Sequence, residues 1–291
     1  MYASPFEYVR VESWGDAVER LAEAGEDARP IAGGQSLAPM MMLRIAEPPV
    51  LVDIGHAGPR AIERVDGTVS ISALARHVDL EQSPEVRTAF PALAEAAGRI
   101  GNVRVRHRGT IGGSLAHSDP AAELPCVAVA ASAAITALGA GGERTIPAAE
   151  LFVGHFTTSL EPGELITQVA FPALRPGQGC AFAELSRRPG DFATVEACAV
   201  AELSADGSWA DGRLVAGALG DRPLDLSAAL EPLRGERPTD ALLAEVAHVA
   251  AERVEPGPSS HGSPGYRRHM LAVIARRTLA AALERAGERR A

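Results

Sequence analysis

Apolar and polar positions recur with different periods along the first 55 residues, and the change of period separates helices from strands. A stretch with helical spacing begins after Ser13, a residue type that caps helix N-termini, and ends at Gly25. Short apolar runs at residues 30–32 and 50–54 predict strands, and residues 36–43 between them predict a helix. Strand, glycine turn, helix and strand in this order are typical of a small α/β unit.

The next part of the chain predicts a hairpin, several helices and two longer strands. Asp66-Gly67 stands between two short stretches that alternate as strands do, which indicates a two-residue hairpin turn. The other predicted elements are helices over residues 78–81, 85–90, 92–99 and 121–129, and strands over 133–138 and 165–171. Pro172 ends the second of these two strands, because proline has no N–H to donate to a sheet.

A stretch rich in proline and glycine at residues 174–179 predicts a domain boundary. The elements predicted beyond it are strands over residues 181–185, 195–203 and 214–219 and helices over 239–253 and 264–285. We therefore expect an α+β protein with a first domain over residues 1–174. A C-terminal α+β domain over 179–288, with a three-stranded sheet and helices, completes the chain.

Composition is that of an ordinary globular protein with an acidic surface. The 291 residues are 46% hydrophobic and 22% charged, with a formal net charge of -9. Nucleic acids and anionic membranes need basic binding surfaces, so neither is an expected partner. The chain contains no lysine, which excludes a lysine Schiff base and a Walker-type phosphate lysine. Any phosphate must therefore be bound by main-chain N–H groups, hydroxyls or arginine.

The cysteines and histidines give no sign of a metal site. Cys126, Cys180 and Cys198 are widely spaced in apolar surroundings, which is typical of buried reduced thiols. No Cys-x-x-Cys pair is present to hold an iron–sulfur cluster, and the eight histidines lack the spacing of zinc ligands. The N-terminus lacks a signal-peptide pattern, and the mildly apolar stretch 126–142 is too short to span a bilayer. We expect a cytoplasmic protein without a transmembrane segment.

Two glycine pairs, far apart in the chain, are the main chemical signal. Residues 32–37 read Ala-Gly-Gly-Gln-Ser-Leu, and residues 110–114 read Thr-Ile-Gly-Gly-Ser. Each pair precedes a small polar residue where a strand is expected to give way to a turn, and Ser36 is a predicted helix N-cap. Each pair alone is more typical of a tight turn, but together they predict a diphosphate held by main-chain amides. No Gly-x-Gly-x-x-Gly pattern occurs, which disfavours a nicotinamide-binding Rossmann site.

The two glycine segments, taken with other stretches in the same order, resemble the flavoprotein subunit of the molybdenum hydroxylase family. This family includes xanthine dehydrogenase and aerobic carbon monoxide dehydrogenase, whose middle subunit binds FAD. The further matching stretches are residues 39–44, 100–104, 160–166, 190–194 and 266–269. The likeness runs over nearly the whole chain, whose length fits a separate middle subunit.

The resemblance implies a fold of the PCMH type, in which two α/β subdomains, of about residues 1–55 and 56–174, hold FAD non-covalently. An α+β domain lies behind them. The two glycine segments would cradle the diphosphate, and Glu123 would hold a ribose or a nearby polar group. Ile100 would lie near the isoalloxazine, Ile166 would pack on the adenine or ring system, and Phe192 would approach the flavin. The residues expected at FAD are Ala32, Gly33, Gly34, Gln35, Ser36, Leu37, Ile100, Thr110, Ile111, Gly112, Gly113, Ser114, Glu123, Ile166 and Phe192.

A few positions depart from the family pattern or leave their role open. Ser114 stands where relatives often have asparagine or aspartate, and Ala183 and Glu184 stand where many have a lysine. The second difference leaves open whether this strand contacts the flavin. Every second residue of 104–108 is arginine, which fits either a solvated strand edge or a contact surface for a partner or the diphosphate.

The function implied by the resemblance is electron transfer within a complex. A large partner subunit would carry the molybdenum cofactor and a small one the 2Fe–2S clusters, and FAD on this chain would pass electrons to an external acceptor. A dimer of such three-subunit units is implied, with no catalytic side chain and no metal ligand on this chain. Two alternatives stay open: a free-standing FAD-dependent oxidoreductase and a non-catalytic flavin-binding module. Neither the substrate nor the acceptor follows from the sequence.

Overall fold

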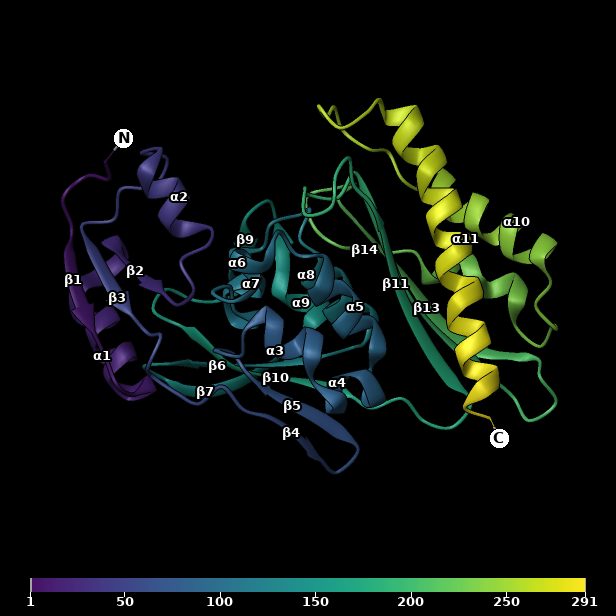
Figure 1. The fold of residues 1–291 in the computed structure, drawn as a ribbon, viewed down its shortest axis with the longest axis horizontal. Coiled ribbons are helices and arrows are strands. Elements are labelled where there is room, and N and C mark those ends of the chain that lie inside the picture. The colour runs from purple at the N-terminus through teal and green to yellow at the C-terminus, as the bar shows by residue number, and fades with distance from the viewer. Residues whose placement is uncertain (1, 291) are drawn as a thin grey trace.

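The computed structural model describes residues 2–290, so Met1 of the predicted first domain lies outside the described residues. The chain forms an N-terminal lobe, a central sheet covered by helices, and a C-terminal sheet covered by two long helices (Figure 1). Among these residues, no helix combines the length and the apolar character needed to cross a membrane.

The N-terminal lobe is a three-stranded parallel sheet with helices beside it. Its strand order is β1-β3-β2, with β1 at Glu7–Arg10, β2 at Ala28–Ile31 and β3 at Val50–Asp53. Helix α1 (Trp14–Ala24) begins where the Ser13 hydroxyl accepts the N–H of Asp16 at 3.1 Å, and Gly25 ends it, as predicted. Helix α2 (Leu37–Met42) follows the first glycine pair.

The central part is a five-stranded antiparallel sheet in the order β4-β5-β10-β6-β7, with helices packed on one face (Figure 1). Asp66 and Gly67 make the predicted tight turn between β4 and β5, and both have positive φ (47° and 76°). The strands are β4 (Ile62–Val65), β5 (Thr68–Ser72), β6 (Ala134–Gly139), β7 (Gly142–Pro147) and β10 (Leu165–Pro172), beside a small separate pair, β8 (Phe152–Gly154) and β9 (Thr157–Thr158). The helices are α3 (His77–Gln82), α4 (Pro84–Ala89), α5 (Pro91–Arg99), α6 (Val103–Arg106), α7 (Ile111–His117), α8 (Glu123–Ala130) and α9 (Ala148–Leu151).

The C-terminal part is an antiparallel sheet in the order β11-β12-β13-β14, with two helices on one face (Figure 1). The sequence predicted three strands here. The structure adds a fourth, β14, whose two residues are too few to show a strand period. The bounds are β11 (Gln178–Leu185), β12 (Val195–Leu203), β13 (Trp209–Gly217), β14 (Leu224–Asp225), a 3₁₀ segment (Ser227–Leu233), α10 (Asp240–Glu252) and α11 (Pro264–Glu288).

One apolar core joins the central part to the C-terminal sheet. It includes Ile71 and Val169 of the central sheet together with Phe182, Cys198 and Val215 of the C-terminal sheet. Helices α5 and α8 contact the C-terminal sheet on the face opposite to α10 and α11. A second core lies between this sheet and α10 and α11, and a third fills the N-terminal lobe. The three cysteines are free and buried, as their surroundings predicted.

The alternating arginines of residues 104–108 do not lie on a strand edge, so that part of the prediction is wrong. Val103–Arg106 is a single helical turn, α6, and the Asn102 side chain caps it by accepting the N–H of Arg104 at 2.9 Å. The helical turn points the arginines in different directions. Arg106 makes an ion pair with Glu81 at 2.9 Å.

Candidate functional site

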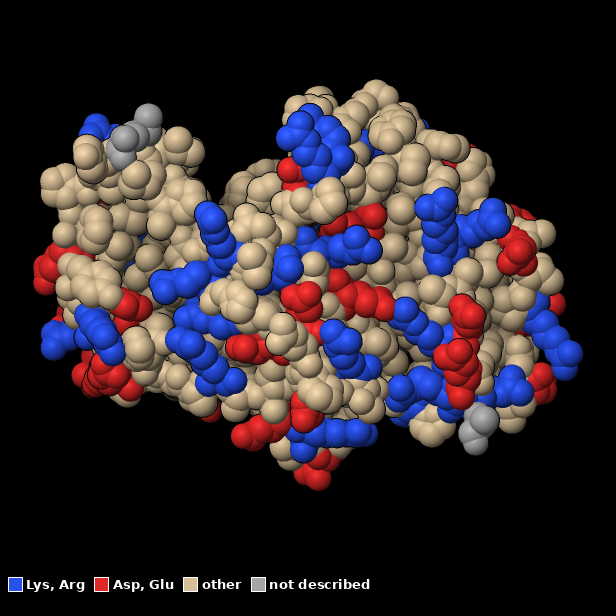
Figure 2. All heavy atoms as spheres, in the orientation of Figure 1, with Lys and Arg blue, Asp and Glu red and all other residues tan. Residues whose placement is uncertain are grey.

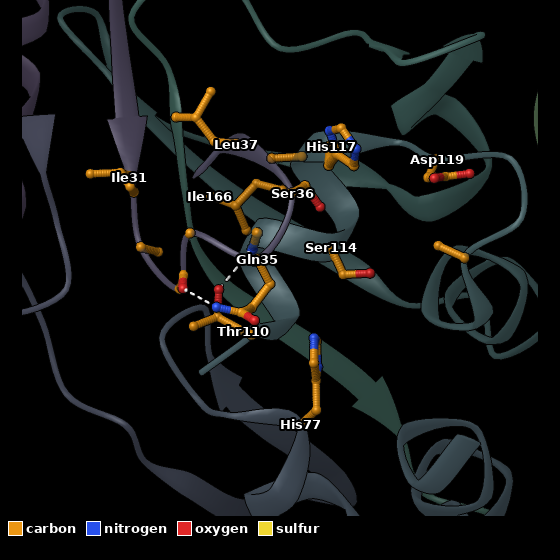
Figure 3. Close-up of a pocket in the computed structure, with 18 of the residues that line it drawn as sticks. Ile31, Gln35, Ser36, Leu37, His77, Thr110, Ser114, His117, Asp119 and Ile166 are labelled. Carbon is orange, nitrogen blue, oxygen red and sulfur yellow. Dashed lines mark hydrogen bonds between the residues drawn. The ribbon is translucent and has the colours of Figure 1, made fainter. Parts of the chain in front are cut away.

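A cavity of about 900 Å³ opens between the N-terminal lobe and the central part. Its lining comes from the turn between β2 and α2, from the helices and β10 of the central part, and from the loop at residues 190–192. The space-filling view shows a hollow between the N-terminal lobe and the rest of the molecule (Figure 2). Figure 3 shows side chains from the N-terminal lobe and the central part around one space. This volume is at the upper end of the range for cofactor pockets.

The first glycine segment, residues 32–37, is the turn between β2 and α2. Gly34 has φ +70°, and a Cβ on Gly33 would lie 2.9 Å from Gly109 Cα, so both positions require glycine. Within residues 2–290, the main-chain N–H groups of residues 33–37 donate to no protein acceptor. The Gln35 side chain folds back, and its Nε2 donates to the Gly33 carbonyl at 3.1 Å (Figure 3). Consecutive unpaired N–H groups beside a cavity form a concave binding site for an anion.

Ser36 does not cap helix α2, which corrects the sequence prediction. Its backbone is already near helical values, at φ −105° and ψ −52°, whereas a capping residue is extended, and its side chain makes no capping hydrogen bond. The Ser36 hydroxyl is therefore left for the cavity, and Figure 3 shows this side chain among those around the space.

The second glycine segment, residues 110–114, is the start of helix α7 and not a loop. Thr110 caps the helix, since its Oγ1 accepts the N–H of Gly113 at 3.1 Å (Figure 3). The N–H of Ile111 donates to the Ala75 carbonyl at 3.1 Å, and that of Gly112 donates to Ala73 at 2.9 Å. The N–H groups of residues 111–114 all have protein acceptors, so any contribution of these four residues to a ligand comes from their side chains, above all Ser114.

The glycines of the second segment serve packing. A Cβ on Gly112 would lie 2.6 Å from Ala73 Cβ and 2.9 Å from its carbonyl oxygen, so only glycine lets α7 sit this close to the chain at Ala73. A Cβ on Gly113 would lie 2.8 Å from Thr110 Oγ1, the atom that caps the helix. The side chain of Ile111 is fully buried in the core and does not line the cavity. Every other residue predicted at FAD does line it.

The predicted apolar residues lie at three points of the cavity wall. Ile100 follows the end of α5 and is half-buried, and Ile166 lies on β10 beside a β-bulge that interrupts the pairing with β6. Bulges of this kind re-aim side chains next to functional sites. Phe192 is 58% exposed, in the loop before β12. Gly190 of that loop packs against Gly101, where a Cβ would lie 2.9 Å from the Gly101 carbonyl carbon, so this loop is held at the cavity.

His77 is a cavity residue that the sequence did not indicate. It opens helix α3 and is buried, with no hydrogen-bond partner for Nδ1 within the described part of the chain. Figure 3 shows the ring pointing toward the space around Thr110 and Ser114. Burial, and then the charges of Arg76 and Arg106, lower the pKa of His77 to about 4, so the ring is neutral near pH 7. A lone histidine at a helix start carries no pattern that separates this position from a surface one.

Glu123 is the first residue of helix α8 and lies on the cavity wall, buried to 5% exposure. Burial raises the pKa of Glu123 to about 8 despite a main-chain hydrogen bond, and the charges of Glu184 and Asp119 raise it further. At neutral pH this residue is therefore an uncharged acid, which both donates and accepts hydrogen bonds.

The structure also answers whether strand β11 reaches the cavity. Among the described residues, neither Ala183 nor Glu184 lines it. Glu184 is partly buried beside Ser186, whose hydroxyl donates to it at 3.4 Å, and burial raises the pKa of Glu184. The influence of Glu184 on the cavity is thus electrostatic and passes through Glu123.

Comparison with known proteins identifies the family to which the chain belongs. Residues 4–174 match the family described as the FAD binding domain in molybdopterin dehydrogenase, and residues 180–282 match the carbon monoxide dehydrogenase flavoprotein C-terminal domain. The chain belongs to the FAD-binding medium subunits of the molybdenum hydroxylase family.

Individual relatives match over almost their whole length. The 6-hydroxypseudooxynicotine dehydrogenase complex subunit alpha of Paenarthrobacter nicotinovorans is 42% identical, over 97% of this chain and 95% of its own. A solved structure of carbon monoxide dehydrogenase from Hydrogenophaga pseudoflava has a TM-score of 0.94 at 36% identity, covering 98% of this chain and 99% of that one. Quinoline 2-oxidoreductase from Pseudomonas putida 86 has a TM-score of 0.93 at 32% identity, covering 98% and 99%.

The geometry of the cavity fits the cofactor that this family binds. FAD carries a diphosphate, and the unpaired N–H groups of residues 33–37 supply donors for it without any lysine. FAD also carries two ring systems, and the wall offers the apolar side chains of Ile100, Ile166 and Phe192. The assignment of single residues to parts of the cofactor stays a prediction.

Proposed function

We propose that this chain holds FAD in the cavity between its two glycine segments and passes electrons through it, as the medium subunit of a molybdenum-containing dehydrogenase. The observation that carries the proposal is the row of main-chain N–H groups at residues 33–37. These residues line the cavity, and their N–H groups have no acceptor in the described protein. Hydrogen bonds from such donors to a charged acceptor are each worth about 1.5–3 kcal/mol.

Each part of the site has a definite task in this proposal. The amides of residues 33–37 and the hydroxyls of Ser36 and Ser114 bind the diphosphate, while Ile100 and Ile166 pack against the rings. Glu123 offers a hydrogen bond to a ribose or a nearby polar group. The bound cofactor supplies reversible electron transfer, and this chain orients it and sets the electrostatics around it. No side chain of this chain acts as a nucleophile or general base in the proposed reaction.

The proposed partners are a large subunit with the molybdenum cofactor and a small subunit with 2Fe–2S clusters, in a dimer of three-subunit units. The names of the relatives support this, since they are a complex subunit alpha and a carbon monoxide dehydrogenase medium chain. Basic and acidic side chains are interspersed over the face in Figure 2, which is not the single-sign surface of a nucleic-acid-binding protein. We place the complex in the cytoplasm and the domain boundary at residues 174–179, between the two matched segments.

The proposal is tested by expressing the full chain together with the proposed large and small subunits and purifying it through a tag on this chain. We expect one FAD per chain, released by denaturation, together with two co-purifying subunits that contain molybdenum and iron. A flavin-bound chain that oxidises a substrate alone would instead support a free-standing enzyme. A folded, colourless chain that takes up no FAD, even within the complex, would contradict the proposal.

A further inference from the structure

Three glutamates lie together where helix α8 packs on the C-terminal sheet. Glu184 of β11 and Glu196 of β12 are directly opposite each other across the two strands, so their side chains project to the same face. That face is turned to the central part, because Cys198, two residues further along β12, belongs to the core shared with it. Glu123 begins α8, and the segment before it is tied to the sheet by the Ala218 N–H, which donates to the Pro120 carbonyl at 2.8 Å.

Glu196 is an uncharged acid in this arrangement. It is fully buried, and neither carboxyl oxygen has a hydrogen-bond partner within residues 2–290. It lies over Gly217 of β13, where a Cβ would fall 2.8 Å from Glu196 Cδ. The described residues hold no group of acids, histidines and cysteines arranged for a metal ion, so a proton is what neutralises this carboxyl.

Glu123 is the one of the three that lines the cavity. The charged groups that face it are both acidic, Asp119 in the preceding turn and Glu184 across the interface. The nearby cation, Arg99 of α5, acts on Glu184. The thiols Cys126 and Cys198 lie beside Glu196 and carry no charge, because burial raises their pKa well above the usual value. Burial and like charge both oppose ionisation of Glu123, and within the described chain no cation that faces it offsets them.

We propose that Glu123 meets bound FAD as a neutral hydrogen-bond donor. Its burial at the cavity wall keeps the proton on it, and the charge of Glu184, a positioning residue, adds to this effect. The inference rests on the proposed binding of FAD in this cavity. A protonated carboxyl donates to the polar atom that it faces, whereas a carboxylate only accepts and also repels a diphosphate. The pKa of about 8 means that Glu123 keeps its proton at neutral pH and loses it in mildly alkaline solution.

The test is the FAD affinity of the full chain as a function of pH, measured from the quenching of flavin fluorescence by the apo protein. The wild-type affinity is expected to be constant near pH 7 and roughly tenfold weaker by about pH 9. Glu123→Gln, which keeps an N–H donor but has no proton to lose, is expected to give a flat profile. Glu184→Gln removes the charge that opposes ionisation, so its fall in affinity is expected at lower pH than in the wild type.

Two matched variants separate charge from structure. Glu196→Gln exchanges one neutral group for another, and Glu245→Gln changes an exposed residue of α10, so both are expected to follow the wild-type profile. Circular dichroism at each pH checks that every variant is folded. A flat wild-type profile, or a Glu184→Gln profile that coincides with the wild type, overturns this inference alone. A chain that takes up no FAD at any pH, alone or in its complex, overturns the proposed function and this inference with it.

Discussion

The two glycine segments have similar sequences and opposite uses of their main chain. Residues 33–37 line a cavity, and their N–H groups have no acceptor in the described protein. The N–H groups of residues 111–114 all donate to carbonyls or to the capping hydroxyl. The first pair of glycines permits a turn and a close approach to Gly109, and the second permits a helix to pack against Ala73. A glycine pair before a small polar residue therefore does not identify an anion site. N–H groups that have no acceptor within the protein do.

The largest expected effect is that of Gly112→Val, which tests the packing role of the second segment. Its Cβ would meet Ala73 Cβ at 2.6 Å, and the two further methyl groups have no space. We expect a loss of about 3 kcal/mol in the free energy of unfolding, measured by urea denaturation. Gly287→Val in α11, where a Cβ meets nothing within 4 Å, is the control. A Gly112→Val chain as stable as the control would show that α7 is free to move, and the comparison would fail.

Low pH is expected to reduce the stability of the chain near the second glycine segment, because it favours protonation of His77. The main-chain N–H of His77 donates to the Gly109 carbonyl at 3.1 Å, just before that segment. The pKa of its ring is about 4 in the folded chain and has its ordinary value of 6.5 in the unfolded chain, so the unfolded chain binds more protons between these values. Stability is therefore complete above pH 6.5 and falls as the pH drops toward 4, by about 3 kcal/mol.

Urea unfolding at pH 7 and at about pH 4.5 measures this loss. His77→Gln is expected to remove that part of the pH dependence, and His269→Gln, at an exposed position of α11, is expected to leave it unchanged. Equal pH dependence in the wild type and His77→Gln would mean that the buried ring is not the responsible group.

Gly34→Ala tests whether the first glycine segment binds the cofactor. Gly34 has φ +70°, so alanine strains the turn by about 1 kcal/mol and rotates the donors of residues 33–37. We expect FAD affinity to fall about tenfold while the chain stays folded. Gly67→Ala, at φ +76° in the β4–β5 hairpin, introduces the same strain away from the cavity and should keep full affinity. Equal FAD affinity in both variants would rule out diphosphate binding by the N–H groups of residues 33–37.

The smallest expected effect is that of Thr110→Ala, which removes the capping hydroxyl that accepts the Gly113 N–H. The expected loss is about 1 kcal/mol of stability, read as a lower midpoint of thermal unfolding, with a smaller change in FAD affinity than for Gly34→Ala. Thr110→Ser keeps the hydroxyl and should restore both. A loss of FAD binding larger than that of Gly34→Ala would show that the second segment, and not the first, dominates the anion site.

Sequence reasoning succeeded where the signal was local. The cap at Ser13, the hairpin turn at Asp66-Gly67 and the order of strand, glycine turn and helix around residues 32–37 depend on residues near one another in the chain. The mixed fold class was also predicted, because element order reflects these local periods. The cavity residues followed from the resemblance, and all but Ile111 lie around one space.

What the sequence did not provide depends on contacts between distant segments. Gly112 is glycine because of Ala73, and nothing near it in the chain distinguishes a helix that must pack closely from a loop. The pairing of Glu184 with Glu196 needs the register of β11 and β12, and the burial of His77 needs the second segment in place. Such facts depend on tertiary packing, which overrides local preference.

The core that runs from the central sheet into Phe182, Cys198 and Val215 joins the central part to the C-terminal sheet without a boundary between them. We expect the central part and the C-terminal part to melt in one cooperative transition. A C-terminal domain exchanged for that of a relative would bring its own half of this core, and its side chains would have to fit α5 and α8. In evolution, therefore, we expect the two matched segments to change together, although the chain passes between them only once.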